Sequence, residues 1–266
     1  MPRQAAISFA DSAEVMKEHG FAFSPALMER YNLVPQGISA EMIADKWEIP
    51  RSEMDEIGLR SHQLAHQATE EGRFEREMIP WKNNGDTYVT DQGLRETTLE
   101  GLAKLKPAFK EDGKITAGNS SQVSDGAAGV LLMAREKADA LGLKPRARIY
   151  DQTTVGVDPV IMLTGPIPAT EKLLERNGMK IDDIDLVEIN EAFASVLAAW
   201  RRELEPDMDR VNVNGGAIAL GHPLGSTGAR LITTLLHEME RTDKEMGLVT
   251  MCCGGGLGTG TLIQRL

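Results

Sequence analysis

Three residues with chemically useful side chains, Asn190, His222 and Cys252, stand where apolar stretches of the chain end. An amide, an imidazole and a thiol can together carry a proton and stabilise a developing oxyanion. In α/β sheets the carboxyl ends of the strands gather at one edge, so residues far apart in sequence can converge there. We therefore expect these three side chains to share one site.

The stretch MCCGGGLGTG, residues 251–260, contains both cysteines of the 266-residue chain. Adjacent cysteines are poorly spaced for a disulfide, and the five histidines do not have the spacing of a zinc site. The glycines fit neither nucleotide-binding register. Peptide N–H groups after Cys252 predict a stabilised thiolate there. Cys253 points to the other face and fits a small buried residue better, an alternative that stays open for Cys252.

His222 lies between Gly221 and Pro223, just before a helix predicted to begin at Ser226 or Thr227. The positive end of that helix disfavours imidazolium and predicts a neutral ring that can accept a proton. A structural histidine bonded to a loop carbonyl is the alternative. For Asn190 the alternative is an N-cap of the following helix.

The elements that must position these residues alternate from residue 147 onward. Period-2 and helical patterns predict an α/β fold whose last two strands pair as a hairpin across the glycines. The predicted strands are 147–157, 183–190, 210–216, 246–252 and 259–266, and the predicted helices are 169–178, 191–205 and 228–241.

The preceding region has a helical and heavily charged pattern. Ser52 with Asp55 predicts a capping box that opens a helix ending near Gly72, and Thr97 with Glu100 predicts a second one. A helix rich in alanine and glycine is expected after Ser124.

Composition excludes several classes of protein. A net charge of −11 and a pI near 5.0 argue against a general nucleic-acid binder. No run of about 18 apolar residues predicts a membrane span, and residues 1–20 lack the apolar core of a signal peptide. Two adjacent cysteines indicate a reducing compartment, so we expect a cytoplasmic protein.

Four motifs together resemble the thiolase family of acyl-CoA C-acyltransferases. They are NEAFA (190–194), GGAIALGHPLGSTGAR (215–230), MCCGGGLGTG (251–260) and KITAGNSSQVSDGAA (114–128). The resemblance implies a layered α/β fold with a complete C-terminal half, a helical loop region and an N-terminal half that is largely missing. The expected divisions are an unassigned segment 1–20, the loop region 21–117, the last loop and helix of a truncated N-terminal domain at 118–145, and the C-terminal domain 146–266.

The resemblance also implies roles for single residues. Cys252 is similar to the base that deprotonates the second acyl-CoA, and His222 to the residue that activates the nucleophile and binds a thioester oxygen. Asn190 is similar to the residue that orients a water molecule in that oxyanion hole, and the N–H of Gly254 to a donor of the second hole. The implied coenzyme A contacts are Ser121 and an apolar tunnel lining of Phe109, Met162 and Phe193.

The implied activity is thiolytic cleavage or Claisen condensation of 3-ketoacyl-CoA in fatty acid metabolism, with coenzyme A thioesters as substrates and neither cofactor nor metal. The chain lacks a third cysteine for the acylated nucleophile. Two alternatives stay open: a non-catalytic coenzyme A-binding subunit that completes its fold with a partner chain, and a hydrolase-type Cys–His–Asn site. A homo- or hetero-oligomer is expected, because packing surfaces of the missing half would otherwise be exposed.

Overall fold

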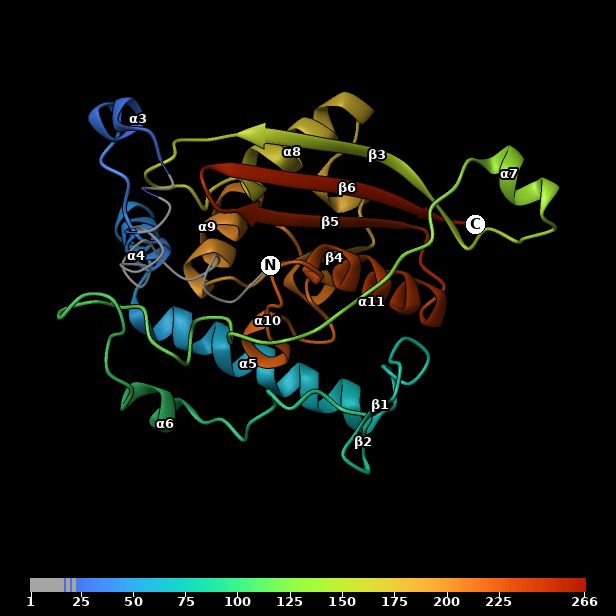
Figure 1. Cartoon of the computed structure of the whole chain (residues 1–266), viewed down its shortest axis with the longest axis horizontal. Coiled ribbons are helices and arrows are strands. Elements are labelled where there is room, and N and C mark those ends of the chain that lie inside the picture. Colours follow the sequence, from blue (N-terminus) through green and yellow to red (C-terminus); the bar gives the residue numbers. More distant parts are fainter. Residues whose placement is uncertain (1–16, 18–19, 21–22) are drawn as a thin grey trace.

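A four-stranded mixed sheet organises the second half of the chain in this computed structural model, which describes residues 17, 20 and 23–266 (Figure 1). Its order is β3-β6-β5-β4; β4 and β5 run parallel, and the other two pairs are antiparallel. The strands are β3 (Ala147–Gly156), β4 (Leu186–Ile189), β5 (Met246–Cys253) and β6 (Leu257–Arg265).

Helices cover both faces of the sheet at β4, whose four residues are all buried. Along β4, Val187 and Ile189 join the larger core, which contains residues of α8 (Pro166–Asn177) and α9 (Ala194–Leu204). Leu186, which precedes Val187 and so points to the other face, packs in a second core with Leu231 of α11 (Thr227–Arg241). The two cores therefore lie on opposite faces of β4.

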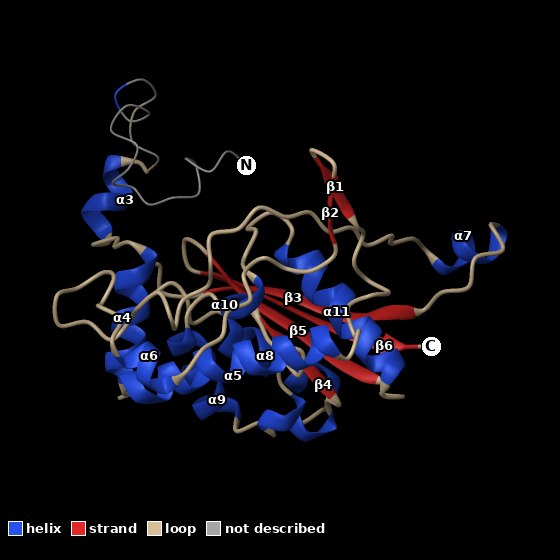
Figure 2. Cartoon of the chain, turned by 90° about the horizontal axis from the view of Figure 1, so that it is seen from below, coloured by secondary structure: helices blue, strands red, loops and turns tan. Residues whose placement is uncertain are grey.

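The first half of the chain wraps around α9 and α11 with helices and long loops. Helix α5 packs against α9 and α10, and the small β1–β2 hairpin projects away from the body (Figure 2). The elements of this first half are α3 (Pro25–Arg30), α4 (Gln36–Lys46), α5 (Arg51–Glu70), β1 (Trp81–Asn83), β2 (Asp86–Tyr88) and α6 (Leu99–Ala103). Helix α10, in the second half, is Ala217–Leu220.

Most predicted elements are confirmed, but the predicted capping boxes are displaced. Helix α5 starts at Arg51 with Pro50 as its N-cap, and Asp55 pairs with Arg51 instead of capping. The cap of α6 is Thr98, whose Oγ1 accepts a hydrogen bond from Gly101 N at 3.1 Å. Helix α5 therefore begins two residues before, and α6 one residue after, the position that the sequence pattern gave.

The predicted strand 210–216 is wrong. Only Val211 forms an isolated parallel bridge, to Val187, after a short 3-10 turn, Met208–Arg210. The side chain of Asn212 replaces the missing ladder, since it accepts from Ile189 N and donates to Ile189 O, each at 2.9 Å. One buried amide thus mimics a backbone pairing.

The helix predicted after Ser124 is also wrong. Residues 121–134 are extended, and only α7 (Arg135–Ala140) is helical in that region. Leu131 and Leu132 are 80% and 64% exposed. A helix needs a buried apolar face, and the described part of the chain offers this segment none.

The glycine turn between β5 and β6 has a structural cause. Gly255 and Gly256 have φ angles of 85° and 84°, which residues with a Cβ rarely adopt. A Cβ on Gly256 would also lie 2.8 Å from the carbonyl oxygen of Val157. Two of the three consecutive glycines are therefore required by the predicted hairpin, which is confirmed.

Candidate functional site

The structure brings Asn190 and His222 into direct contact. Asn190 follows the last residue of β4, and its backbone N–H bonds to the carbonyl of Thr250 on β5 at 3.1 Å. Its side-chain Nδ2 lies 3.3 Å from Nε2 of His222. Two motifs that are 32 residues apart therefore meet at the carboxyl end of the sheet, as predicted for this pair.

Thr227 fixes the proton on the imidazole. Its Oγ1 lies 2.7 Å from Nδ1 of His222 and 2.9 Å from the carbonyl oxygen of Pro223, to which it donates. Since Oγ1 has one proton, it accepts from Nδ1–H. The amide of Asn190 donates to Nε2, which is therefore the unprotonated ring nitrogen and faces the site.

The imidazole is neutral at physiological pH. Burial, followed by the positive charge of Arg230, lowers the pKa of His222 from 6.5 to about 4. The predicted neutral state agrees with this direction, but desolvation and a neighbouring guanidinium cause it, whereas the sequence argument invoked the helix dipole. His222 can therefore accept a proton through Nε2.

Asn190 is fully buried, and its Oδ1 lacks a hydrogen-bond partner among the described residues. A buried amide oxygen without a donor is costly, so it marks a place where a water molecule or ligand would bind. The alternative of Asn190 as an N-cap is wrong, because α9 begins at Ala194 with Phe193 in the cap position.

Cys252 is buried at the end of β5, and burial raises the pKa of its thiol to about 12. The predicted thiolate is therefore wrong for this state: desolvation outweighs any stabilisation by the glycine amides. Cys253 is the more exposed of the two, the reverse of our expectation. Within the described residues, neither sulfur forms a hydrogen bond with the imidazole of His222.

Gly254 opens the exposed turn that joins β5 to β6. A Cβ placed on it would lie 3.0 Å from Nε2 of Gln36. Because Gly254 directly follows the two cysteines, its N–H belongs to this turn. The resemblance to the family implied that this N–H donates to an oxyanion.

A short extended stretch, residues 119–122, ties the two motifs together. Ser121 N donates to Ala192 O at 3.0 Å, and Ala194 N donates to Asn119 O at 2.9 Å, beside the NEAFA motif. The carbonyl of Gln122 accepts from His222 N at 3.1 Å. Ser121, predicted to contact coenzyme A, is therefore held by its backbone next to the segment that follows Asn190.

The predicted apolar lining also converges. The rings of Phe109 and Phe193 meet edge to face with their centroids 5.9 Å apart. Phe193, Met162 and Cys252 belong to one buried cluster. Phe109 is 43% exposed, so it forms the outer margin of this apolar group.

A cavity of about 270 Å³ lies beside the His222 loop. Its lining includes Gly221 and Pro223, which flank His222, together with Ser226 and Arg230 of the following segment and helix. This places polar and charged groups next to the loop.

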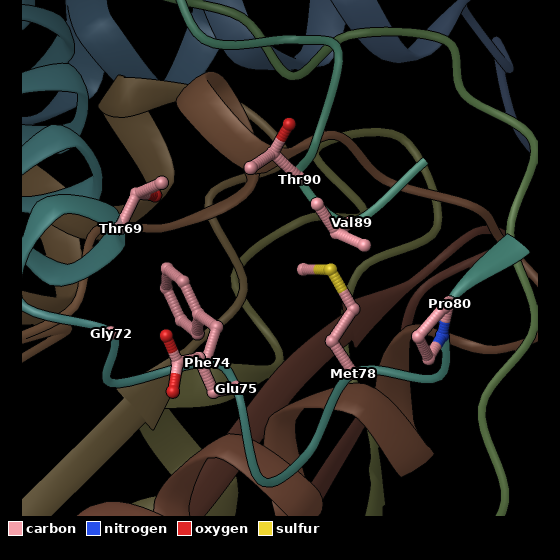
Figure 3. A pocket seen from close by; sticks show the side chains of 8 residues that line it. All are labelled: Thr69, Gly72, Phe74, Glu75, Met78, Pro80, Val89 and Thr90. Carbon is pink, nitrogen blue, oxygen red and sulfur yellow. The ribbon is translucent and has the colours of Figure 1, made fainter. Parts of the chain in front are cut away.

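A larger hollow of about 410 Å³ adjoins this cavity after the end of α5, and Phe74 and Met78 line both. Figure 3 shows Phe74, Met78 and Val89 around it. Glu75 is its only ionisable lining side chain among the described residues, and it includes none of the predicted site residues. Neither cavity is lined by a predicted site residue, but the smaller one reaches Gly221 and Pro223 beside His222, so the larger one is the weaker candidate for catalysis.

Sequence reasoning missed the buried carboxylate of Glu191, directly after Asn190. Its carboxylate accepts hydrogen bonds from Ser61 Oγ (2.6 Å), Asn212 Nδ2 (3.0 Å) and Ile218 N (3.2 Å). Burial raises its pKa, and these donors oppose the rise. The acidic residue inside an otherwise apolar NEAFA stretch was the available signal.

Residues 17, 20 and 23–266 hold no group of three or more His, Cys, Asp or Glu side chains arranged to bind a metal ion. In the same residues every helix is too short or too polar to cross a lipid bilayer.

Two family models match the chain. "Thiolase, C-terminal domain" matches residues 143–265, and "Thiolase, N-terminal domain" matches residues 3–136. The expectation that residues 1–20 fall outside the family is therefore wrong, although most of them lie outside the described residues. The expectation of a largely missing N-terminal half is likewise corrected, since that domain's model matches just over half of the chain.

Several relatives are similar over most of this chain. An acetyl-CoA acetyltransferase of Syntrophomonas wolfei is 49% identical over 90% of the chain and 62% of its own length. A steroid 3-ketoacyl-CoA thiolase of Mycobacterium tuberculosis is 50% identical over 88% and 57%. The crystal structure of the Bacillus anthracis acetyl-CoA acetyltransferase matches with a TM-score of 0.84 and 45% identity, over 88% of this chain and 60% of that one. The chain thus spans about three fifths of the length of these relatives.

Proposed function

Because the chain belongs to the thiolase family, we propose that it supplies the His222, Asn190 and Cys252 side of an acyl-CoA C-acyltransferase site. The observation that carries this proposal is the contact between Asn190 and a neutral His222 whose Nε2 is unprotonated. Names of relatives, acetyl-CoA acetyltransferase and 3-ketoacyl-CoA thiolase, point to the same class of reaction.

In the cleavage direction, Nε2 of His222 accepts the proton of an attacking thiol, whose sulfur then bonds to the 3-keto carbon of the substrate. The bond between C2 and C3 breaks, and the departing thioester leaves as an enolate. Cys252, kept protonated by burial, donates its proton to C2 of that enolate. The resulting thiolate accepts the proton of coenzyme A, whose sulfur bonds to the acyl carbon. The bond from that carbon to the first sulfur breaks, and this sulfur recovers its proton from Nε2 of His222.

Oxyanion stabilisation is assigned to the remaining predicted groups. The partnerless Oδ1 of Asn190 would orient a water molecule that donates to the thioester oxygen, and the N–H of Gly254 would serve the enolate. Ser121 and the apolar group of Phe109, Met162 and Phe193 would contact the pantetheine arm. Coenzyme A thioesters are the substrates in this scheme.

The attacking thiol must come from outside these 266 residues, because Cys252 and Cys253 are the only cysteines present. We therefore propose that activity belongs to a longer or complemented form. The test combines the purified chain with the N-terminal part of a longer relative and follows thiolysis of acetoacetyl-CoA. We expect activity in the mixture, little in the chain alone, and loss in the mixture with Cys252→Ser. Equal activity of that variant would refute the role of Cys252.

A second candidate, a coenzyme A-binding subunit that completes its fold with a partner chain, is favoured by one observation. Four consecutive apolar residues of the extended segment, Val130 to Met133, are between 36% and 80% exposed. This subunit would bind coenzyme A without turnover in the complemented form. A monomer in gel filtration that also lacks coenzyme A binding would count against it.

The hydrolase-type site is the weakest alternative. It requires a thiol hydrogen-bonded to the imidazole, and neither cysteine has such a bond within the described residues. Oligomeric state and location in the cytoplasm stay predictions.

A further inference from the structure

A second contact joins the elements that hold Asn190 and His222. Oε2 of Glu188 lies 3.3 Å from Nη1 of Arg230. Glu188 precedes Asn190 by two residues, so both side chains extend to the same side of the sheet. Arg230 follows Thr227 by three residues, so both lie on one side of α11. The two contacts are therefore neighbours: one joins β4 to α11, and the other joins the end of β4 to the loop before α11.

We propose that Glu188 and Arg230 are positioning residues that hold the amide of Asn190 against the imidazole of His222. Their value for catalysis rests on the proposed function, but the positioning itself is a property of the chain. His222 is tied to α11 through Thr227, and Asn190 continues β4. The hydrogen bond from Arg230 to Glu188 restrains α11 from sliding along β4 and so maintains the 3.3 Å separation of the two side chains.

Stability alone explains this pair poorly. Glu188 is 2% exposed, and a buried ion pair adds little net stability compared with apolar residues of similar volume. Its geometry, however, is restrictive, because a guanidinium and a carboxyl group must face each other at short range. Fixing the register of a helix on a strand is a use that suits such a pair.

The guanidinium also acts on the imidazole electrostatically. Nη2 of Arg230 is buried without a partner among the described residues, so Glu188 engages only part of the group. Burial raises the pKa of Glu188 to about 8, and Arg230 opposes that rise. Through the acidic range in which His222 would titrate, the guanidinium is therefore the charged member of the pair. The other ionisable groups around it are Glu77, Asp91, Asp125, Glu191, His237 and Glu238.

The test uses histidine-ring NMR on the full chain without substrate, with the His222 signals assigned by their loss in His222→Asn. Its readouts are the tautomer at neutral pH and the titration midpoint. Arg230→Met should raise the midpoint by about one unit and give a mixture of tautomers. Glu188→Gln should stay close to wild type, because its amide oxygen still accepts from Arg230. The matched control is Arg241→Met, which breaks the 2.6 Å pair with Glu238 further along α11 and should leave His222 unchanged.

Wild-type tautomer and midpoint in Arg230→Met would overturn the proposal, as would an equal change in Arg241→Met. Should Arg230→Met not fold, the double variant Glu188→Gln/Arg230→Met decides by the same two readouts, since it buries no unpaired charge. Failure of the acyltransferase assay leaves these spectra unaffected, so the two proposals fail independently.

Discussion

Replacing Thr227 by valine tests how the imidazole is held. Thr227 is fully buried, and its Oγ1 is the only described acceptor for Nδ1–H of His222, at 2.7 Å. Valine keeps the shape and removes that acceptor. A buried donor left unpaired costs about 1–3 kcal/mol, so we expect the free energy of unfolding to fall by that amount in urea denaturation.

The ring can recover part of this loss by moving its proton to Nε2. The amide of Asn190 must then turn so that Oδ1, which has no partner in the wild type, accepts it. We therefore expect the Nδ1–H tautomer in the wild type and the Nε2–H tautomer in Thr227→Val. Two-dimensional ¹⁵N NMR of the histidine rings near pH 7 distinguishes them, because the ring is neutral there.

Thr227→Ser is the control, since it loses a methyl group and keeps the hydroxyl. It should retain the wild-type tautomer. An Nε2–H ring in the wild type, or an unchanged ring in Thr227→Val, would refute the hydrogen-bond assignment and with it the unprotonated Nε2 on which the proposed base depends.

Three further predictions follow from the same structure. Cys253 should react with iodoacetamide well before Cys252 at pH 8, because burial raises the pKa of Cys252 to about 12. Mass spectrometry of the modified peptides gives the order of reaction. Faster labelling of Cys252 would contradict its burial. In a thermal unfolding assay, Gly256→Ala should destabilise the chain by more than about 1 kcal/mol, because position 256 has a positive φ and an added Cβ would contact Val157. Gly225→Ala should be nearly neutral in the same assay, because an added Cβ there meets open space. Thr170→Val should cost about 1–3 kcal/mol, because Nε1 of the fully buried Trp200 loses its acceptor at 3.0 Å; unchanged urea stability would show that the indole finds another partner.

The sequence predicted the elements that local pattern determines. Helix α11 has an apolar stripe that includes Leu231 and Leu235, and both are buried in the core on its face of the sheet. The β5–β6 hairpin follows from alternating strands joined by glycines. The meeting of Asn190 and His222 was predicted from strand ends, but this reason holds only for Asn190, which follows β4. His222 reaches it from the loop between α10 and α11, because the strand expected before that loop is absent.

Features that depend on tertiary context could not be predicted in this way. The strand expected at 210–216 gave way because the side chain of Asn212 pairs with Ile189 in place of a backbone ladder. The helix expected after Ser124 does not form, because no described surface buries its apolar side and the helix propensity of its alanines is not sufficient alone. The protonation state of Cys252 depends on the burial of its side chain, which could not be predicted from the sequence around the two cysteines.

Residues 119–122 have a further consequence, because this one short stretch touches the chain beside both Asn190 and His222. If thermal motion or a neighbouring molecule displaces it, both walls of the site are carried along together. Such a shared displacement changes where the site is but leaves the gap between amide and imidazole nearly constant. The contact that orients the imidazole therefore depends on this stretch as well as on the two motifs themselves.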